Sequence, residues 1–168
     1  PCINAGAAMS ENGGLDFWGS ALYHGQPDIG AHESAFATPE QGVQLQINDN
    51  DRKIAYLGSW TYDTACTGGY SGDSHYTKSA GAAAAISFKG TAVAWLGQKD
   101  VNYGLADVYL DGVLKETVDC YNARNIYQQV LFSAVDLAPG EHTLRIVCKG
   151  QKSASSQDSY IDVDSILY

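Results

Sequence analysis

The chain has 168 residues, of which 45% are hydrophobic, and it contains 18 glycines, 11 tyrosines and one methionine, a composition typical of a β-rich protein with many turns. Its formal net charge of −9 argues against nucleic acids and anionic membranes as partners, because both attract a positive field. No run of about 18 apolar residues occurs, so the sequence predicts no transmembrane helix. The negative charge is also typical of secreted proteins. Because the chain begins at Pro1 without a signal peptide, we interpret it as a piece of a longer protein.

Residues 1–40 show little strand periodicity, and their Gly, Asn and Asp residues predict tight turns between single apolar residues. Three segments, PCINAG, NGGLDFWG and PDIGAHE, resemble the closing coils of right-handed parallel β-helix proteins, many of which are secreted polysaccharide lyases or glycoside hydrolases. The resemblance implies that residues 1–40 are the C-terminal remnant of a β-helix. The alternative is an irregular N-terminal arm that packs on the main domain. The polar, proline-containing segment ATPEQG at 37–42 predicts a domain boundary near residue 40.

Residues 41–168 have the alternation of a β-sandwich and no convincing helix. The candidate strands are 52–60, 80–88, 91–97, 104–110, 113–119, 128–135, 141–149 and 159–167. Two connections are very short, Lys89-Gly90 and Asp111-Gly112, and the second predicts a hairpin with a type I′ turn. The predicted fold class is therefore all-β: an eight-stranded antiparallel β-sandwich of jelly-roll type, preceded by an irregular N-terminal segment.

The connections between these strands differ in length and in residue composition. Since antiparallel strands alternate in direction, successive connections fall at alternate ends of the sandwich. The long, decorated connections 61–79, 98–103, 120–127 and 150–158 are then expected at one end, and the short turns at the other. Loops on a rigid scaffold are a usual place for binding sites. The sequence therefore predicts one rim that carries the ligand site.

Tyrosines, amides and charged side chains gather in these long connections. A flat aromatic face suits the C–H face of a pyranose ring, while amides and charged groups can pair with its hydroxyls. The candidate ligand-binding residues, in order for the aromatic group, are Tyr121, Tyr103, Tyr70 and Tyr76, with Asn102, Arg124, Asn125 and Lys99 as hydroxyl partners. The alternative is structural, because tyrosines often cap the ends of strands, and Arg124 could simply pair with a neighbouring aspartate.

The segments ISFKGTAVAWLG, YGLADVYLDG, YQQVLF, LAPGEHTLRI and YIDVDSI resemble galactose-binding-like β-sandwich modules of secreted bacterial carbohydrate-active enzymes. The resemblance implies a non-catalytic carbohydrate-binding module that is secreted, binds an oligosaccharide or polysaccharide, and serves a catalytic domain in the same polypeptide. The rim loops vary most between such modules, so binding residues do not carry over. A protein-interaction or cell-surface adhesion domain is the alternative.

Carboxylates raise two further possibilities. Asp49 and Asp51 enter the first strand near the expected position of Asp162 and Asp164, which lie on one face of the last strand, so these four residues are candidate calcium ligands. The resemblance supports a structural calcium, and an Asp-rich turn is the alternative. Carboxylates at the rim could also perform acid–base chemistry on a glycoside. However, no Ser-His-Asp, His-cluster or phosphate-binding motif occurs, so we expect no catalysis by this chain.

Two expectations concern the cysteines. Cys148 follows Leu144 and Ile146 at period two, which favours a buried thiol on the core face of a strand. Cys66 and Cys120 both fall in predicted loops and could form a disulfide.

Overall fold

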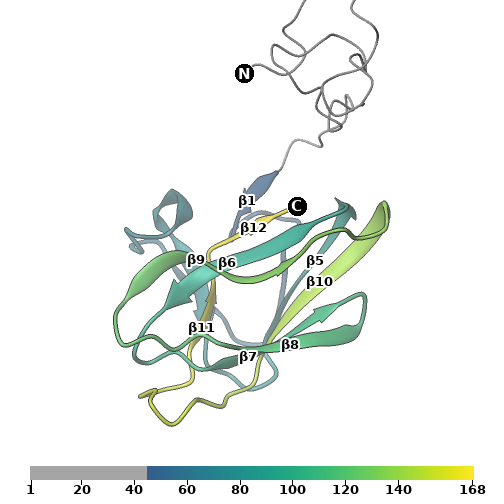
Figure 1. The fold of residues 1–168 in the computed structure, drawn as a ribbon. Helices are drawn as coiled ribbons and strands as arrows, with labels where there is room; N and C mark the ends of the chain where they lie inside the picture. Colours follow the sequence, from purple (N-terminus) through teal and green to yellow (C-terminus); the bar gives the residue numbers. More distant parts are fainter. Residues whose placement is uncertain (1–44) are drawn as a thin grey trace, which may run out of the picture. The chain divides into compact units, whose positions relative to one another are not determined.

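The computed structural model describes residues 45–168, and these residues form an all-β domain (Figure 1). The predicted boundary near residue 40 and the segments that resemble a β-helix lie outside the described residues, so both stay predictions. Within residues 45–168 no helix is long and apolar enough to cross a membrane.

Twelve strands and one short 3-10 turn make up the described chain. They are β1 (Gln46–Asn48), β2 (Ala55–Leu57), β3 (Thr61–Asp63), the 3-10 turn η1 (Tyr70–Gly72), β4 (Ser74–Thr77), β5 (Ala83–Gly90), β6 (Val93–Lys99), β7 (Leu105–Leu110), β8 (Val113–Asp119), β9 (Ile126–Ala134), β10 (Gly140–Cys148), β11 (Ile161–Val163) and β12 (Ser165–Leu167). One sheet has the order β1-β12-β6-β9, a second β2-β5-β10-β7-β8, and a small third sheet β11-β4-β3. All strand pairs between these elements are antiparallel, which confirms the predicted β-sandwich class.

The core lies between the two larger sheets, where alternate strand residues point inward. β7 alternates between half-buried and buried residues along its whole length, which is the pattern of a strand with one face on a core. Trp95 from β6 is completely buried, together with Leu144 and Ile146 from β10. The Trp95 indole donates a hydrogen bond to the backbone oxygen of Asp162 at 3.1 Å, so burial leaves its polar N–H paired.

The predicted strands that form the centre of the sandwich are present, and the short ones differ. The expected strand 52–60 is reduced to β2. The short strands β1, β3 and β4, of three or four residues each, were not predicted. The expected strand 159–167 is divided at Asp164, because β11 pairs with β4 whereas β12 pairs with β6 and β1.

Of the two short turns predicted from the sequence, one is present where it was expected and the other is displaced. Asp111 and Gly112 have φ values of 53° and 77°, as a type I′ turn requires, which confirms the predicted β7–β8 hairpin. Lys89 and Gly90, by contrast, belong to β5. The connection is formed by residues 91–92 and carries the chain from one sheet to the other, so the prediction of a turn at 89–90 is wrong by two residues.

The strand directions place the long connections at one end of the sandwich, which we call the loop end. There, connections 100–104, 120–125 and 149–160 hydrogen-bond to one another: Asn122 N donates to Asp100 O, Tyr160 N to Asn102 O, and Gln157 N to Val101 O. The last of these connections is the yellow segment before β11 in Figure 1. At the opposite, short-turn end, Leu137 N donates to Thr91 O. The expected segregation of long and short connections is therefore present.

The three cysteines in the described part of the chain are buried and free. The burial expected for Cys148 is confirmed, and its side chain is completely enclosed. The possible disulfide between Cys66 and Cys120 is absent. Both are buried thiols, and burial raises the pKa of each.

Candidate functional site

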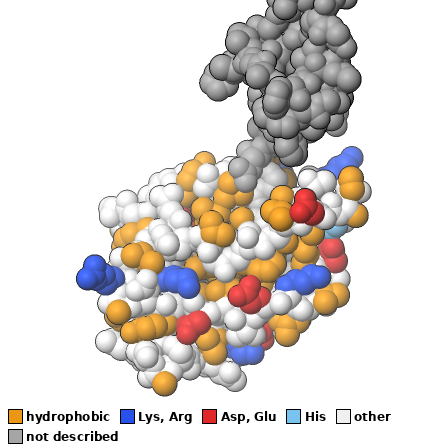
Figure 2. All heavy atoms as spheres, in the orientation of Figure 1, with side chains coloured by type: hydrophobic (Ala, Val, Ile, Leu, Met, Phe, Trp, Pro, Cys, Tyr) orange, Lys and Arg blue, Asp and Glu red, His pale blue; other side chains and the backbone are white. Residues whose placement is uncertain are grey.

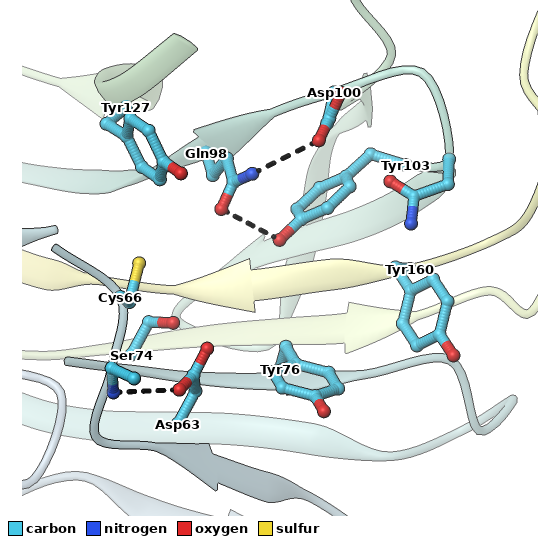
Figure 3. Close-up of a pocket in the computed structure, with 11 residues that line it drawn as sticks. Asp63, Cys66, Ser74, Tyr76, Gln98, Asp100, Tyr103, Tyr127 and Tyr160 are labelled. Atoms are coloured by element: carbon cyan, nitrogen blue, oxygen red, sulfur yellow. Dashed lines mark hydrogen bonds between the residues drawn. The ribbon is translucent and has the colours of Figure 1, made fainter. Parts of the chain in front are cut away.

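A cavity of about 390 Å³ opens at the loop end. This volume falls in the range of roughly 300–1,000 Å³ that is common for small-molecule sites. Its lining comes from the β3–β4 region, the start of the β6–β7 connection, β9 and the residue before β11. The lining residues are Asp63, Ala65, Cys66, Ser74, Tyr76, Gln98, Asp100, Asn102, Tyr103, Tyr127 and Tyr160. Figure 3 shows Asp63, Ser74 and Tyr76 on one side, opposite Tyr127, Gln98 and Tyr103.

One wall of the cavity is the β3–β4 hairpin. Asp63 pairs with Ser74 in its register, and Thr61 pairs with Tyr76. Because side chains alternate across a strand, Ser74 and Tyr76 share the face that lines the cavity, while His75 lies on the other face. The strand alternation of SHYT therefore delivers a hydroxyl and a phenol to the site.

His75 anchors the back of this hairpin. Its ring is stacked between Tyr56 and Tyr62, with centroid separations of 4.3 and 4.6 Å. Its Nδ1 lies 2.5 Å from Oδ2 of the buried Asp49. Burial lowers the pKa of His75 and raises that of Asp49 to about 7, with the charge of Asp73 adding to the second effect. This cluster, which includes the buried Asp49 and the exposed Tyr62, links the hairpin to the sandwich without lining the cavity.

The opposite wall contains a short chain of hydrogen bonds. The hydroxyl of Tyr103 donates to Oε1 of Gln98 at 3.2 Å, and Nε2 of Gln98 lies 3.4 Å from Oδ2 of Asp100 (Figure 3). The other oxygen of Asp100 accepts from the backbone N–H of Val101 at 2.7 Å. Tyr103 is only 7% exposed, and burial raises the pKa of its phenol. Tyr103 therefore turns its ring edge and its hydrogen-bonded hydroxyl toward the cavity, while the faces of its ring pack in the core.

Three other tyrosines line the cavity and are less buried than Tyr103. Tyr76 and Tyr160 meet edge to face, with ring centroids 5.7 Å apart and an interplanar angle of 72°. Tyr127 is 37% exposed, and its hydroxyl accepts a hydrogen bond from Nδ2 of Asn125 at 3.1 Å. These rings are the aromatic surfaces that a sugar ring could contact.

Of the eight ligand-binding residues predicted from the sequence, three line the cavity: Tyr76, Tyr103 and Asn102. The side-chain oxygen of Asn102 is buried without a hydrogen-bond partner within the described residues. Tyr103 is too buried for a sugar ring to stack on its face.

The other five predicted residues lie outside the lining. They are Tyr121, Tyr70, Arg124, Asn125 and Lys99. The backbone N–H of Tyr70 binds Asp164 Oδ1 at 2.7 Å, and the Lys99 ammonium donates to the backbone oxygen of Asp119 at 2.9 Å. Arg124 is exposed, in a turn where its backbone N–H binds Asn122 Oδ1. The loop end brings these residues near the site, and it does not place them in the cavity.

The cavity also contains residues that the sequence did not single out. Tyr160 was expected in the strand 159–167 and not at the rim. The other seven lie in connections expected at the rim but were not ranked as ligand-binding: Asp63, Ala65, Cys66, Ser74, Gln98, Asp100 and Tyr127. Tyr160 directly precedes the apolar β11, so its sequence context is typical of a strand. Its position at the end of the longest loop was the only signal that could have placed it at the site.

The four predicted metal ligands do not share one point. Asp51 caps its own turn by accepting from Lys53 N at 2.8 Å, and Asp162 accepts from Gln98 N at 2.8 Å. Asp49 and Asp164 are adjacent, since Asp49 N donates to the backbone oxygen of Asp164 at 3.1 Å. In residues 45–168, no three Asp, Glu, His or Cys side chains are arranged to hold a metal ion.

Asp49 and Asp164 are the two predicted metal ligands that have unpaired carboxylate oxygens among residues 45–168. One carboxylate oxygen of Asp49 and one of Asp164 are buried without a hydrogen-bond partner among residues 45–168. Burial raises the pKa of Asp164 to about 6, with the charge of Asp73 adding to the effect. Unpaired carboxylate oxygens suit Ca²⁺, although this cation takes six to eight oxygens. The calcium site stays a prediction, with Asp49 and Asp164 as its best-placed residues.

Charge is dispersed over the face of the described domain that Figure 2 shows. On the face shown in Figure 2, acidic and basic side chains occur singly among uncharged and hydrophobic ones. That face therefore carries no concentrated basic patch of the kind that nucleic-acid binding uses.

Comparison with known proteins relates the chain to carbohydrate-active enzymes. It is 43% identical over 106 residues to an A type blood N-acetyl-alpha-D-galactosamine deacetylase of Flavonifractor plautii, a match that covers 63% of this chain and 14% of that protein. It is 39% identical over 130 residues to an A type blood alpha-D-galactosamine galactosaminidase of the same organism, covering 77% of this chain and 11% of that protein. The chain thus spans only a small part of the length of these relatives. No protein-family model matches the sequence.

Solved structures show the same fold in other enzymes of this broad class. A two-domain esterase active on acetylated mannans, crystallised with mannopentaose, matches with a TM-score of 0.54 and 12% identity, over 74% of this chain and 36% of the esterase chain. A Paenibacillus xanthan lyase matches with a TM-score of 0.50 and 13% identity, over 67% of this chain and 12% of the lyase. At these identities the likeness concerns the fold alone.

Proposed function

We propose that residues 45–168 form a non-catalytic carbohydrate-binding module, which brings a carbohydrate-active catalytic domain of the same polypeptide to its glycan outside the cell. The observation that carries this proposal is the tyrosine-walled cavity at the loop end. The similarity to segments of enzymes that act on galactosamine-containing sugars supports a glycan as the ligand.

The cavity has the features that a weak sugar site needs. Tyr76, Tyr127 and Tyr160 supply aromatic surfaces, and Asp63, Gln98 and Asp100 supply acceptors for sugar hydroxyls. Most of these polar groups are already held by neighbouring backbone or side chains, so little ordering is required on binding. We expect dissociation constants in the micromolar to millimolar range, which corresponds to roughly 4–8 kcal/mol.

Calorimetry with the complete chain, guided by a glycan array, tests this proposal. Tyr160→Ala and Tyr76→Ala should each abolish detectable sugar binding, because a single stacked ring supplies much of the affinity of a weak site. Tyr109→Ala is the matched control, since Tyr109 is a half-buried tyrosine on β7 that does not line the cavity. Binding that survives both cavity variants, or a chain that binds no glycan and instead binds a protein, would refute the proposal.

A cleavage assay separates this module from an enzyme. The two carboxylates of the cavity, Asp63 and Asp100, are both partly exposed. We expect no turnover of aryl galactosaminides or galactosides by the complete chain, and no release of acetate from N-acetylgalactosamine. Turnover that disappears in Asp100→Asn would show that the chain is itself catalytic.

A further inference from the structure

The lining of the cavity is acidic. It contains the carboxylates of Asp63 and Asp100 and the phenols of four tyrosines, and no Lys, Arg or His is among its described residues. The cavity therefore carries a formal charge of −2 when both carboxylates are ionised. An anionic sugar, such as a uronic acid or a sulfated residue, would be repelled there.

Neither carboxylate has a cationic partner in the described part of the chain. The aspartates that form ion pairs within residues 45–168 are Asp49, Asp158, Asp111 and Asp107. Asp63 accepts one hydrogen bond, from the backbone N–H of Ala65 at 2.8 Å, and Asp100 accepts from Val101 N and Gln98 Nε2. All of these donors are neutral, so the negative charge of the cavity is uncompensated.

The two lysines beside the cavity are directed elsewhere. The Lys78 ammonium lies 4.8 Å from the ring centroid of Tyr160, and it pairs with Asp158 at 2.8 Å. The Lys99 ammonium donates to the backbone oxygen of Asp119. Neither therefore neutralises Asp63 or Asp100.

A bound sugar that covers these carboxylates removes water from them. A neutral hydroxyl can donate one hydrogen bond to each carboxylate, but it leaves the charge unbalanced. An ammonium group donates charge-assisted hydrogen bonds, which are roughly twice as strong as neutral ones, and it is also attracted to the faces of tyrosine rings. The chemistry of the lining thus favours a ligand that combines a pyranose ring with a positive charge.

We propose that the cavity selects a hexosamine with a free amino group over its neutral and N-acetylated counterparts. This inference rests on the proposed function, and it assigns the class of sugar that the same site takes. The ammonium of the 2-amino-2-deoxyhexose lies against Asp63 or Asp100, and the ring packs on the exposed tyrosines.

Calorimetry with the complete chain at pH 6 tests the preference with sugars that differ at one carbon. Galactosamine and galactose differ only by an ammonium in place of a hydroxyl, and N-acetylgalactosamine removes the charge. Glucosamine and glucose form a second pair. We expect the amine of the preferred pair to bind at least tenfold more tightly than the neutral sugar. That ratio should shrink in 0.5 M NaCl, because salt screens a partly exposed ion pair.

Charge-neutral variants identify the residues. Asp100→Asn or Asp63→Asn should reduce the amine-to-hydroxyl ratio toward one, because each removes a negative charge that distinguishes an ammonium from a hydroxyl. Glu116→Gln is the matched control, because it removes one negative charge from an exposed position on β8, outside the cavity. Lysine methyl ester provides an ammonium without a sugar ring and should not bind.

The outcomes separate this inference from the proposed function. If no sugar binds, both are refuted. If galactose or N-acetylgalactosamine binds as tightly as galactosamine, the sugar site stands and the amine preference is refuted. Equal ratios in the wild type and in both Asp→Asn variants would also refute it, as would binding of lysine methyl ester with the affinity of galactosamine.

Discussion

At the scale of single residues, Gly68 controls the position of an exposed ring of the cavity. A Cβ atom at Gly68 would lie 2.5 Å from Cε2 of the Tyr127 ring, which is too close for any side chain. We therefore expect Gly68→Ala to displace Tyr127 and to weaken sugar binding by about tenfold, or about 1.4 kcal/mol, in calorimetry. Gly140→Ala is the control, because a Cβ atom there meets nothing within 4 Å. Unchanged affinity in Gly68→Ala would show that Tyr127 takes no part in binding.

His142 predicts a pH dependence of stability. Its two ring nitrogens lie 2.7 Å from Oδ2 of Asp111 and 2.7 Å from the backbone oxygen of Ala138, and both partners are acceptors. The Ala138 carbonyl, and after it Asp111, therefore raise the pKa of His142 above 6.5. A raised folded-state pKa gives stability that is fully present below pH 6.5 and is lost as the pH rises through the folded value.

Urea unfolding at a series of pH values between about 5 and 9 measures this contribution. The unfolding free energy of the wild type should fall more steeply with rising pH than that of His142→Ala. Asp111→Asn should also flatten the curve while keeping the turn, because Asn tolerates the positive φ at this position. Parallel curves for the wild type and His142→Ala would show that folding does not raise the pKa of His142.

At the scale of elements, one buried hydroxyl holds the longest loop against its neighbour. Ser156 is 3% exposed, and its Oγ lies 2.6 Å from the backbone oxygen of Tyr103, to which it can donate. Ser156→Ala leaves that carbonyl without this donor and should lower the free energy of unfolding by about 1–3 kcal/mol. Ser155→Ala, at an exposed neighbouring position, should have no measurable effect in thermal or urea unfolding. Equal stabilities of the two variants would contradict this role.

The long strands of the fold could be predicted from the sequence, whereas the short strands could not. β7 was found because half-buried and buried residues alternate along its six positions, and β8 because it follows the turn Asp111-Gly112, whose chemistry is unambiguous. β1 has three residues and pairs with β12, more than a hundred residues away, so no local pattern marks it. The β3–β4 hairpin, which carries one wall of the cavity, was also missed, because its strands have only three and four residues.

The sequence predicted which end of the sandwich carries the candidate site, but it predicted the residues of that site less well. Alternating strand direction places the long loops together, and that argument needs no side-chain detail. Whether a tyrosine in such a loop turns inward depends on tertiary packing. Tyr103 and Tyr160 both line the cavity, but Tyr103 is buried in the core whereas Tyr160 is only partly buried.

At the scale of the whole molecule, the calcium prediction concerns stability. If an ion binds Asp49 and Asp164, it neutralises two buried carboxylates, so chelation should lower the melting temperature of the complete chain. Returning calcium should restore it, whereas magnesium, which demands a tighter octahedral shell, should not. Asp164→Asn should remove the calcium effect, with Asp119→Asn as an exposed control. An unchanged melting temperature after chelation would eliminate the ion.

The domain boundary gives a second prediction at this scale. A fragment that starts near Val43 should fold alone and show the circular dichroism spectrum of a β-protein, because all strands that were predicted lie beyond it. The complete chain serves as the reference, and the fragment should keep the same sugar affinity. A fragment that stays unfolded would show that residues 1–40 are an integral part of one folding unit.

The pairing of β1 with β12 holds the two described ends of the domain side by side. Leu45 and Tyr168 exchange two backbone hydrogen bonds, of 2.8 and 3.0 Å, beside the start of β6 at the short-turn end. Both described ends of the domain therefore lie at the end opposite the tyrosine cavity, and the β1–β12 pairing closes the sandwich without contributing a residue to the cavity lining.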